Sequence, residues 1–327
     1  MKLASLAIQE SSNRNGELIV VSSDNTQAVR VEPKISLLNA LENWSFWEPK
    51  LRSLSEGLNN KTVKGSFKLD LKQCISPLPH CHGFYDGSAF LSHVVRARRA
   101  RGDQMPESAK VTPLMYQGVS DFMLPWSAPI DLMDVGFGGD FEAEFGVILR
   151  DVPKGTPVDK MAPYFALFCL FNDITYREIV KQEIETKFGF LQSKPNSSFA
   201  PLVVTPDELG SAWDGKRILL DVEVKLNDKV FGHPNGREMH FSFGELVAHA
   251  NRTRPLSAGT IVGTGTVSNE AKESGFACLT EKRFQEIIEQ GKPSTPWLQP
   301  GDHLKIDCLQ NGVSVFGAID QVAKIGT

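Results

Sequence analysis

Two kinds of side chain alternate along the stretch Asp140-Phe-Glu-Ala-Glu-Phe-Gly-Val-Ile-Leu149. The first set is apolar and consists of Phe141, Ala143, Phe145, Val147 and Leu149. The second set is Glu142, Glu144, Gly146 and Ile148. A period of two residues is typical of a β-strand. Because residues two apart point to the same face of a strand, the two glutamates are neighbours, roughly 7 Å apart at the backbone.

The face that carries the glutamates is expected to be covered. Gly146 and Ile148 continue it without polarity, whereas a solvated strand edge, the simpler interpretation, would stay polar. Two covered carboxylates repel each other and lose hydration, so either one of them takes up a proton or a cation lies between them. Ligands that are all oxygen favour a hard divalent ion such as Mg²⁺ or Ca²⁺.

Length and composition indicate an ordinary globular protein. The chain has 327 residues, of which 41% are hydrophobic and 23% charged, which is enough for one large domain and a small one. A formal net charge of −4 argues against a protein that binds nucleic acid over a wide surface. The polar N-terminus does not resemble a signal peptide, and no stretch is long and apolar enough to span a membrane. Five widely spaced cysteines favour reduced thiols and a cytoplasmic location.

Residues 1–72 are predicted to form a small β-rich domain. Short strands are expected at 3–8, 18–21 and 28–31, with a turn at Asn15-Gly16 and one or two short helices after them. A polar stretch at 59–65 is interpreted as a linker.

Residues 73–327 are predicted to form a larger domain with many strands and few helices. Helices are expected at 176–188, from a capping box at Ser242 to about 252, and at 281–290. Asn227-Asp228 and Asn311-Gly312 carry the turn chemistry of antiparallel hairpins, over 222–231 and 305–319. Without regular β-α-β alternation, these elements indicate a mixed, β-rich α+β fold.

Three further side chains are candidates for a metal or catalytic site. Asp173 ends the apolar run 164–173, where a strand would present its last side chain at the edge of a sheet. Asp86 precedes a helical-looking stretch, and His93 follows it by seven residues, or about two helical turns. Either aspartate could instead be a helix N-cap, and His93 could be a packed or solvated side chain.

Seven motifs in a fixed order resemble the fumarylacetoacetate hydrolase family over roughly residues 80–320. They are D-x₆-H at 86–93, P-L-x-Y-x-G at 113–118, E-x-E at 142–144, N-D-x-x-x-R at 172–177, Q-S-K at 192–194, G-T-G-T-V-S-N at 263–269 and C-x-x-E at 278–281. The resemblance implies a β-sandwich or roll as the C-terminal domain, with the small β-rich domain before it. It also implies a homodimer.

The resemblance assigns roles residue by residue. Asp86, Glu142, Glu144 and Asp173 match the carboxylates that hold one Mg²⁺, with Ca²⁺ or Mn²⁺ as alternatives. His93 matches the general base and Glu281 the acid that orients it, a pairing that fixes the imidazole tautomer. Arg177 and Lys194 match the cations at the reacting oxygens. Tyr116 and Thr266 match residues that contact the substrate.

The implied activity is a metal-dependent hydrolysis of a C–C bond in a small dioxo acid of the fumarylacetoacetate or acylpyruvate type. A hydratase, decarboxylase or isomerase at the same site is the alternative, and a catalytically silent binding protein is a third reading. Three substrate-contacting positions depart from the animal enzymes: Val180 stands for a glutamine, Ile184 for a tyrosine and Ser88 for another tyrosine. Fumarylacetoacetate itself is therefore in question as the substrate.

Other signals have simpler interpretations. The basic cluster 94–102 contains Arg96, Arg98, Arg99 and Arg101 and could bind phosphate, but a solvated helix face or attraction of an anionic substrate explains it better. His80-Cys81-His82 lacks a second ligand pair at zinc-finger spacing and is interpreted as a loop. The glycine-rich stretch at 263–268 lacks the Gly-Lys-Ser/Thr of a phosphate-binding loop and is interpreted as a tight turn, which is compatible with a place over the site.

Overall fold

Residues Ala143–Leu149 of the stretch at 140–149 form a central strand of the largest sheet. The structure is a computed structural model that describes residues 1–8 and 14–326. β10 (Ala143–Leu149) pairs antiparallel with β11 (Phe165–Asn172), and every residue of both strands is buried. Phe141, Ala143, Phe145, Val147 and Leu149 lie in one hydrophobic core, while Ile148 lies in another on the opposite face. The predicted alternation is confirmed.

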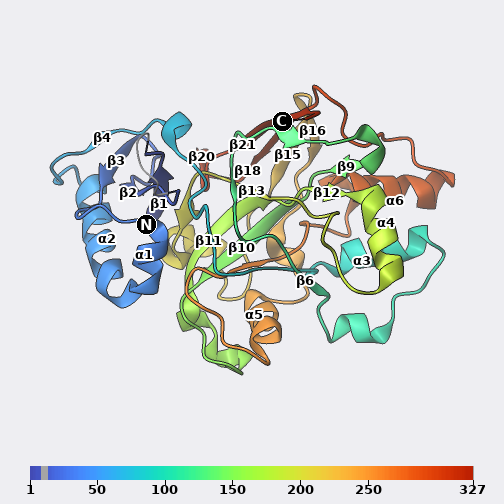
Figure 1. Ribbon diagram of the computed structural model, residues 1–327, viewed down its shortest axis with the longest axis horizontal. Helices are drawn as coiled ribbons and strands as arrows, with labels where there is room; N and C mark the ends of the chain where they lie inside the picture. Colours follow the sequence, from blue (N-terminus) through green and yellow to red (C-terminus); the bar gives the residue numbers. More distant parts are fainter. Residues whose placement is uncertain (9–13, 327) are drawn as a thin grey trace.

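This sheet runs through most of the molecule (Figure 1). Its strand order is β4-β3-β2-β1-β14-β11-β10-β17-β5-β6, with β13 beside β11 and β7 beside β13. The remaining strands are β1 (Lys2–Leu6), β2 (Glu17–Val21), β3 (Gln27–Arg30), β4 (Phe67–Lys68), β5 (Phe84–Gly87), β6 (Met115–Gln117), β7 (Leu124–Pro125), β13 (Ser198–Phe199), β14 (Val203–Val204) and β17 (Ile261–Gly263).

A second sheet, in the order β16-β15-β18-β21-β8, packs on the inner face of the first. Its strands are β8 (Ile130–Asp131), β15 (Glu223–Leu226), β16 (Lys229–Gly232), β18 (His303–Asp307) and β21 (Ile319–Lys324). Val224, Leu304 and Ile306 from this sheet share a core with Phe145 and Val147 of β10. The two sheets form the layered, β-rich arrangement that the sequence predicts. Two small ladders pair β9 (Gly139–Asp140) with β12 (Thr175–Tyr176) and β19 (Leu309–Gln310) with β20 (Val313–Ser314).

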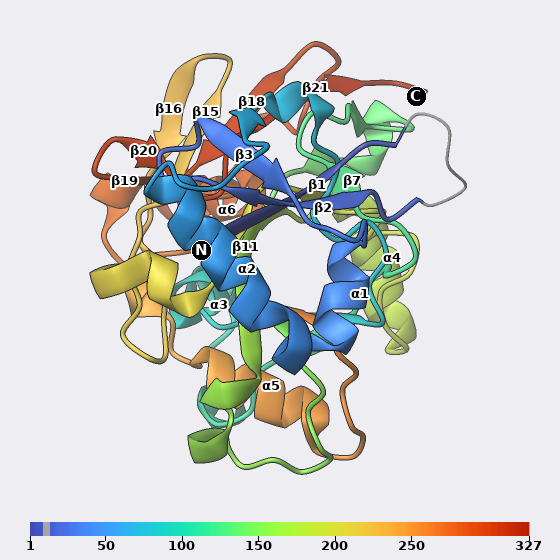
Figure 2. The ribbon, with the colours of Figure 1, turned by 90° about the vertical axis from the view of Figure 1, so that its left-hand side faces the viewer.

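The N-terminal strands continue the large sheet rather than forming a separate one. β1 pairs with β14 of the larger region, and the 59–65 segment leads from α2 into β4, which pairs with β3. α1 (Leu37–Glu42) and α2 (Trp44–Asn59) cover this end of the sheet, as Figure 2 shows. Their side chains Leu41, Trp44 and Leu51 join a core that reaches Leu167 of β11. The boundary at 72/73 stays a prediction.

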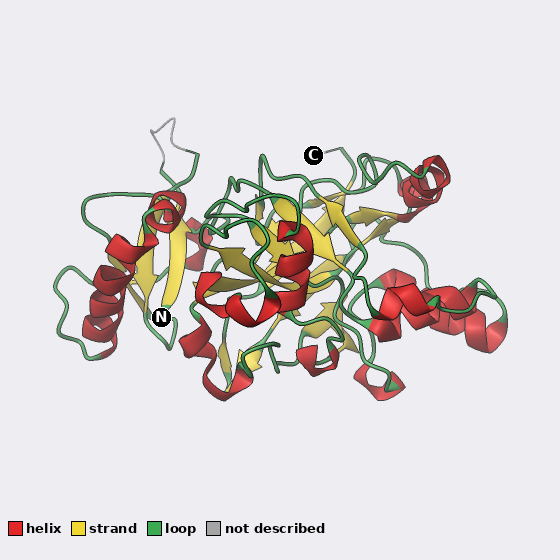
Figure 3. Cartoon of the chain, turned by 90° about the horizontal axis from the view of Figure 1, so that it is seen from below, coloured by secondary structure: helices red, strands yellow, loops and turns green. Residues whose placement is uncertain are grey.

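Four helices accompany the larger region. They are α3 (Leu91–Ala100), α4 (Arg177–Thr186), α5 (Phe243–Asn251) and α6 (Leu279–Gln290). α3, α4 and α6 gather at the end of the molecule opposite the N-terminal strands (Figure 1), and Figure 3 shows how the helices lie around the strands. Short 3₁₀ segments occur at 71–73, 107–110, 135–137, 158–160, 162–164, 206–212, 236–238 and 272–274. None of the helices in the described ranges is long and apolar enough to cross a membrane.

The predicted turns and caps lie where the local sequence requires them. Asn227 and Asp228 have positive φ angles of 53° and 61° between β15 and β16, and Asn311 and Gly312 have 53° and 78° between β19 and β20. Ser242 closes the predicted capping box with the side chain of Glu245. α4 ends two residues before its predicted end, because Lys187 takes the left-handed conformation as its C-cap.

Candidate metal centre and active site

Four neighbouring strands of the large sheet, β11, β10, β17 and β5, bring three predicted acids together. Asp86 lies on β5, opposite Gly263 of β17, and Gly263 lies opposite Gly146 of β10. On the other side of β10, Ala143 pairs with Asn172, so Glu144 lies close to Asp173, which directly follows β11. One carboxylate oxygen from each of Asp86, Glu144 and Asp173 lies within 4.8 Å of the others. Neither aspartate is a helix cap, since α3 and α4 begin only at Leu91 and Arg177.

Gly263 makes room for this cluster. A Cβ atom at this position would lie 2.4 Å from Oδ1 of Asp86 and 3.3 Å from Oε2 of Glu144. A Cβ so close to the Asp86 oxygen would force the carboxylate to move, so any larger residue would displace an acid. The glycine in the motif 263–269 therefore has a steric reason that the sequence alone did not show.

Glu142 and Asp173 are neutralised by cations of the protein. Nζ of Lys194 donates to Oε2 of Glu142 at 2.6 Å and to Oδ2 of Asp173 at 2.5 Å. Nη2 of Arg177 donates to Oε1 of Glu142 at 2.6 Å. Burial alone would raise the pKa of Glu142, but Arg177 and Lys194 outweigh it and hold that pKa below its usual range.

Hydroxyl groups complete the shell around these two acids. Asp173 accepts from the hydroxyls of Tyr116 at 2.7 Å and Ser197 at 2.7 Å. Glu142 accepts from Thr175 at 3.0 Å. All four oxygens of this pair thus have a donor within the protein.

Among the described residues, no cation forms an ion pair with Asp86 or Glu144. Both oxygens of Glu144 are buried without a hydrogen-bond partner, and the residue has no exposed surface. Oδ1 of Asp86 accepts from the backbone N–H of Gly265 at 3.1 Å. Burial, then the charge of Asp173, raises the pKa of Asp86 to about 7, and burial together with Asp86 raises the pKa of Glu144 well above its usual range.

The residues at this edge fit a hard divalent cation. If all were ionised, the five carboxylates of Asp86, Asp140, Glu142, Glu144 and Asp173 would form ion pairs with two cations of the described part of the chain, Arg177 and Lys194. An excess of negative charge would remain in a buried place. The atoms that lack donors are carboxylate oxygens, the ligand type that Mg²⁺, Mn²⁺ and Ca²⁺ share. Asp86, Glu144 and Asp173 would therefore hold the ion, and Glu142 lies beside them.

Asp140 is a functional candidate that the sequence analysis missed. It is fully buried, accepts from Nε of Arg177 at 2.8 Å, and accepts from the first two backbone N–H groups of α6, at Leu279 and Thr280. It thereby fixes both the cation that holds Glu142 and the start of the helix that carries Glu281. Its position two residues before Glu142, which continues the spacing of the two glutamates, was the available signal.

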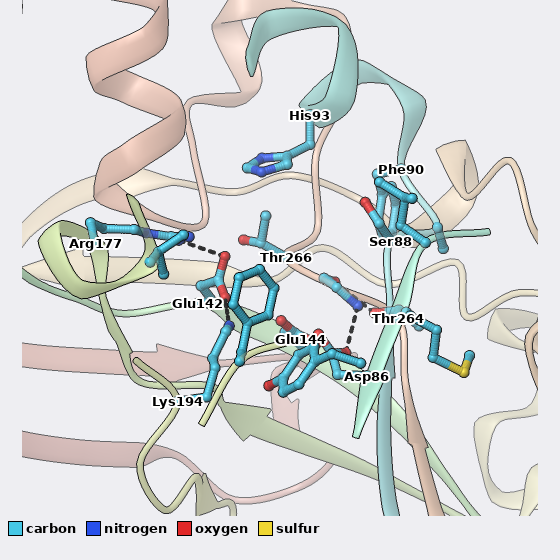
Figure 4. A pocket seen from close by; sticks show the side chains of 18 of the residues that line it. Asp86, Ser88, Phe90, His93, Glu142, Glu144, Arg177, Lys194, Thr264 and Thr266 are labelled. Carbon is cyan, nitrogen blue, oxygen red and sulfur yellow. Dashed lines mark hydrogen bonds and ion pairs between the residues drawn. The ribbon is translucent and has the colours of Figure 1, made fainter. Parts of the chain in front are cut away.

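His93 and Glu281 lie on the opposite side of the site, on α3 and α6. Nδ1 of His93 is 3.7 Å from Oε2 of Glu281, and neither atom has a hydrogen-bond partner within the described ranges of the chain. Figure 4 shows the imidazole across the pocket from Glu144 and Asp86. Ionisation of Glu281 is costly by burial, yet its pKa is held below the usual range by His93 and Arg96.

Arg96 contacts Glu281 from the side away from His93, which corrects the interpretation of this one residue of the basic cluster. Instead of facing solvent, Arg96 is 7% exposed and its Nη1 donates to Oε1 of Glu281 at 2.5 Å. Ser268 donates to the same oxygen at 2.5 Å, and Nη2 of Arg96 donates to the carbonyl of Glu270. Glu281 is left with Oε2 directed towards His93.

A cavity of about 460 Å³ joins the two sides of the site. The predicted site residues that line it are Asp86, His93, Tyr116, Glu142, Glu144, Arg177, Lys194 and Thr266. Asp173 and Glu281 lie just behind this lining, through their contacts with Tyr116 and His93. The three departures from the animal enzymes, Ser88, Val180 and Ile184, also face the cavity, together with Arg98 and Arg101.

The remaining sequence signals lie outside this site. Nδ1 of His80 contacts Asn15, and His82 pairs with Glu42. Neither histidine belongs to the groups of possible metal ligands found in the described part of the chain. The five cysteines are buried and free, as expected for reduced thiols.

Comparisons with known proteins match nearly the whole chain to one family. The family model described as fumarylacetoacetate (FAA) hydrolase C-terminal matches residues 83–325, and that of the fumarylacetoacetase N-terminal domain 2 matches residues 1–80. An uncharacterized protein of Archaeoglobus fulgidus is 23% identical over 160 residues, which are 47% of this chain and 58% of that protein. This chain spans 48–58% of the length of that relative and of relatives from Burkholderia ambifaria.

Solved structures share the fold over the full length. Maleylpyruvate hydrolase from Sphingobium sp. SYK-6 has a TM-score of 0.64 at 14% identity and covers 100% of both chains. The same hydrolase has been solved with manganese(II) and pyruvate. The 5-carboxymethyl-2-hydroxymuconate delta-isomerase from Mycobacterium smegmatis has a TM-score of 0.62 at 13% identity, also with 100% coverage of both chains. The two family matches and the ordered acids of the cavity agree, and the chain belongs to the fumarylacetoacetate hydrolase family.

Proposed function

We propose that the protein is a divalent-metal-dependent enzyme that hydrolyses a C–C bond of a small dioxo acid of the acylpyruvate or fumarylacetoacetate type. The observation that carries the proposal is a single cavity with two unlike sides. One side holds Asp86, Glu144 and the adjoining Asp173, whose buried oxygens suit a cation, and the other holds His93 backed by Glu281. An electrophile and a general base would thus face the same bound molecule.

The ion would supply Lewis acidity to the adjacent oxygens of a dicarbonyl acid. The residues of the chain would then divide the remaining work. Because Nδ1 of His93 faces Glu281, Nε2 is the nitrogen that would take a proton from water. Lys194 and Arg177 would keep positive charge beside the developing enolate, and Tyr116 and Thr266, which line the same cavity, would contact the substrate.

The family resemblance adds a homodimer to the proposal, and the five free cysteines add a cytoplasmic location. Mn²⁺ is a candidate ion besides Mg²⁺ and Ca²⁺, since a similar fold has been solved with manganese(II). The carboxylate oxygens at this site would accept any of the three.

A panel assay tests the proposal. Purified protein is stripped with a chelator, reloaded with Mg²⁺, Mn²⁺ or Ca²⁺, and mixed with a set of 2,4-dioxo acids while the dicarbonyl absorbance is followed. We expect turnover only in the reloaded samples. Metal binding without loss of absorbance for any acid would contradict the hydrolase and favour a binding protein.

An isomerase or decarboxylase is the second candidate, and the apolar wall of the cavity favours it. Val180, Ile184 and Phe190 line the cavity together with His93, and these three side chains offer no hydrogen bond that would hold an attacking water. His93 could still move a proton within the substrate. Product analysis by NMR separates the two, since hydrolysis yields two fragments, isomerisation one product of unchanged mass, and decarboxylation a product shortened by CO₂.

A further inference from the structure

A second chamber adjoins the cavity on the side of His93. It has a volume of about 530 Å³ and lies between α3, α4 and α6, the helices gathered at one end of the molecule in Figure 1. The two spaces share five lining residues: His93, Arg101, Arg177, Val180 and Ile184. The two spaces therefore adjoin at these side chains, and the chamber begins where the lining of the cavity reaches His93.

Apolar side chains from all three helices line the chamber. Ala97 and Ala100 come from α3, Val180 and Ile184 from α4, and Phe284 and Ile287 from α6. The ring of Phe284 lies 6.4 Å from that of His93, centroid to centroid. The chamber thus begins directly beside the candidate base.

The charged side chains around the chamber are mostly engaged elsewhere. Lys181 pairs with Glu178, and Arg283 stacks 3.9 Å over the ring of Trp297 while it donates to the carbonyl of Thr295. Arg101 lies over Phe284, with 6.0 Å between its guanidinium and the ring centroid. Glu185 adds a negative charge to the lining. Arg177, the fourth cation of the lining, is held by Asp140 and Glu142. Each of the four cations thus has an ion-pair, carbonyl or aromatic partner, and the apolar side chains of the three helices are left to contact an apolar group.

We propose that this chamber receives the distal part of the substrate, so that the preferred acids carry an extended alkyl or aryl group beyond the dioxo acid head. The inference rests on the proposed function and narrows its substrate class. Small alanines on α3 leave room for the group, and the side chains of α4 and α6 provide the apolar contact. The head would stay at Asp86, Glu144 and Lys194.

The test uses 2,4-dioxo acids whose distal group is methyl, pentyl or phenyl, with the metal-loaded wild-type protein. Each methylene that leaves water is worth roughly a fourfold gain in binding. Because the chamber is open on one side, we expect a gain in kcat/KM of about tenfold or more from methyl to pentyl. An equal kcat/KM for all three acids, or a preference for an acid of the same length that ends in a carboxylate, would overturn the inference.

Variants locate the effect. Ile287→Asn places a polar group in the chamber, and Ala97→Leu fills part of it. Both should lower kcat/KM for the pentyl acid about tenfold and leave the methyl acid within about twofold. Ile288→Asn is the matched control, because Ile288 is the adjacent residue of α6 and does not line the chamber. An unchanged pentyl preference in folded Ile287→Asn and Ala97→Leu would place the distal group elsewhere.

Failure of the proposed function would look different. If no acid is turned over, the same series is titrated into the metal-loaded protein by calorimetry. Tighter binding of the pentyl and phenyl acids, lost in Ile287→Asn, would support the chamber while the reaction is rejected. Affinities that do not depend on the distal group would reject the chamber.

Discussion

The four predicted metal ligands fall into two pairs with different surroundings. Glu142 and Asp173 have a donor on every carboxylate oxygen, and Lys194 bridges them. Glu144 has no donor on either oxygen, and Asp86 accepts only one backbone N–H from the described residues. All four are buried at the same edge of one sheet. Four equally buried carboxylates therefore differ in their partners: one pair has protein cations, and the other pair has none among the described residues.

The difference indicates which acids depend on an ion. Two buried carboxylates with protein cations need no further charge, whereas two buried carboxylates without them must bind a proton or a metal. The pKa of Glu142 is held low, and the pKa values of Asp86 and Glu144 are raised. We expect Asp86 and Glu144 to contribute most to metal affinity, and Glu142 to organise the cations around them.

His93→Ala should have the largest effect on kcat. It tests whether the base can be removed without a change in the metal affinity of the acids. Loss of a general base lowers kcat by about 10²–10⁴-fold. Metal affinity, measured by calorimetry, should stay within about threefold, because His93 lies across the cavity from the carboxylates. Full activity in the variant would remove His93 from the mechanism.

The variants Glu144→Gln and Glu142→Gln test directly whether the two kinds of acid differ in their contribution to metal affinity. Removing the unpaired charge should weaken the metal roughly hundredfold, while Glu142→Gln should weaken it about tenfold, the scale of an outer-shell change. Both substitutions keep side-chain size, so calorimetry of the two variants isolates the charge. Equal losses would show that the protein cations do not divide the acids as described.

Arg96→Met tests whether Arg96 positions Glu281 on the side of the cavity that carries His93. When the guanidinium of Arg96 is removed, Glu281 loses the contact that directs its Oε2 towards His93. We expect kcat to fall about tenfold with little change in KM or metal affinity, and the pH profile of kcat to shift. Arg96→Lys should restore part of the rate. Arg99→Met, at an exposed position of the same helix, is the control, and an effect there as large as at Arg96 would reject the positioning role.

Metal removal should also make the stability of the protein depend on pH. A folded-state pKa of Asp86 raised to about 7 means that the folded protein binds more protons than the unfolded chain between about pH 4 and 7. Metal-free protein should therefore lose stability as the pH rises through this range, by at most about 1.4 kcal/mol per pH unit for this group. Chemical denaturation at pH 5 and pH 8, with chelator or Mn²⁺, measures it.

The ion should flatten this dependence, because it takes the place of the proton. Asp86→Asn should flatten it in the metal-free protein as well. Two results together would contradict this explanation, in which Asp86 is a buried acid without a protein cation. They are a metal-free wild type that is more stable at pH 8 than at pH 5, and an Asp86→Asn variant whose stability changes with pH at the same slope.

The sequence by itself determined the local features. Alternation from Phe141 to Leu149 specified a strand buried on both faces, and side chains at i and i+2 placed Glu142 and Glu144 together. Asn227-Asp228 and Ser242 specified a turn and a helix start through short-range hydrogen bonds and backbone sterics. The ordered motifs pointed to the family, and both family models match.

Only the tertiary structure decided how these features combine. The strand order β11-β10-β17-β5 brings Asp173, Glu144 and Asp86 together, although 87 positions separate the first from the last in the chain. It also decided that Lys194 neutralises Glu142, that Arg96 turns inward to Glu281, and that a chamber opens beside His93. The physical reason is range: periodicity fixes the face of a side chain within a few residues, whereas distances between charges depend on which distant strands and helices pack together.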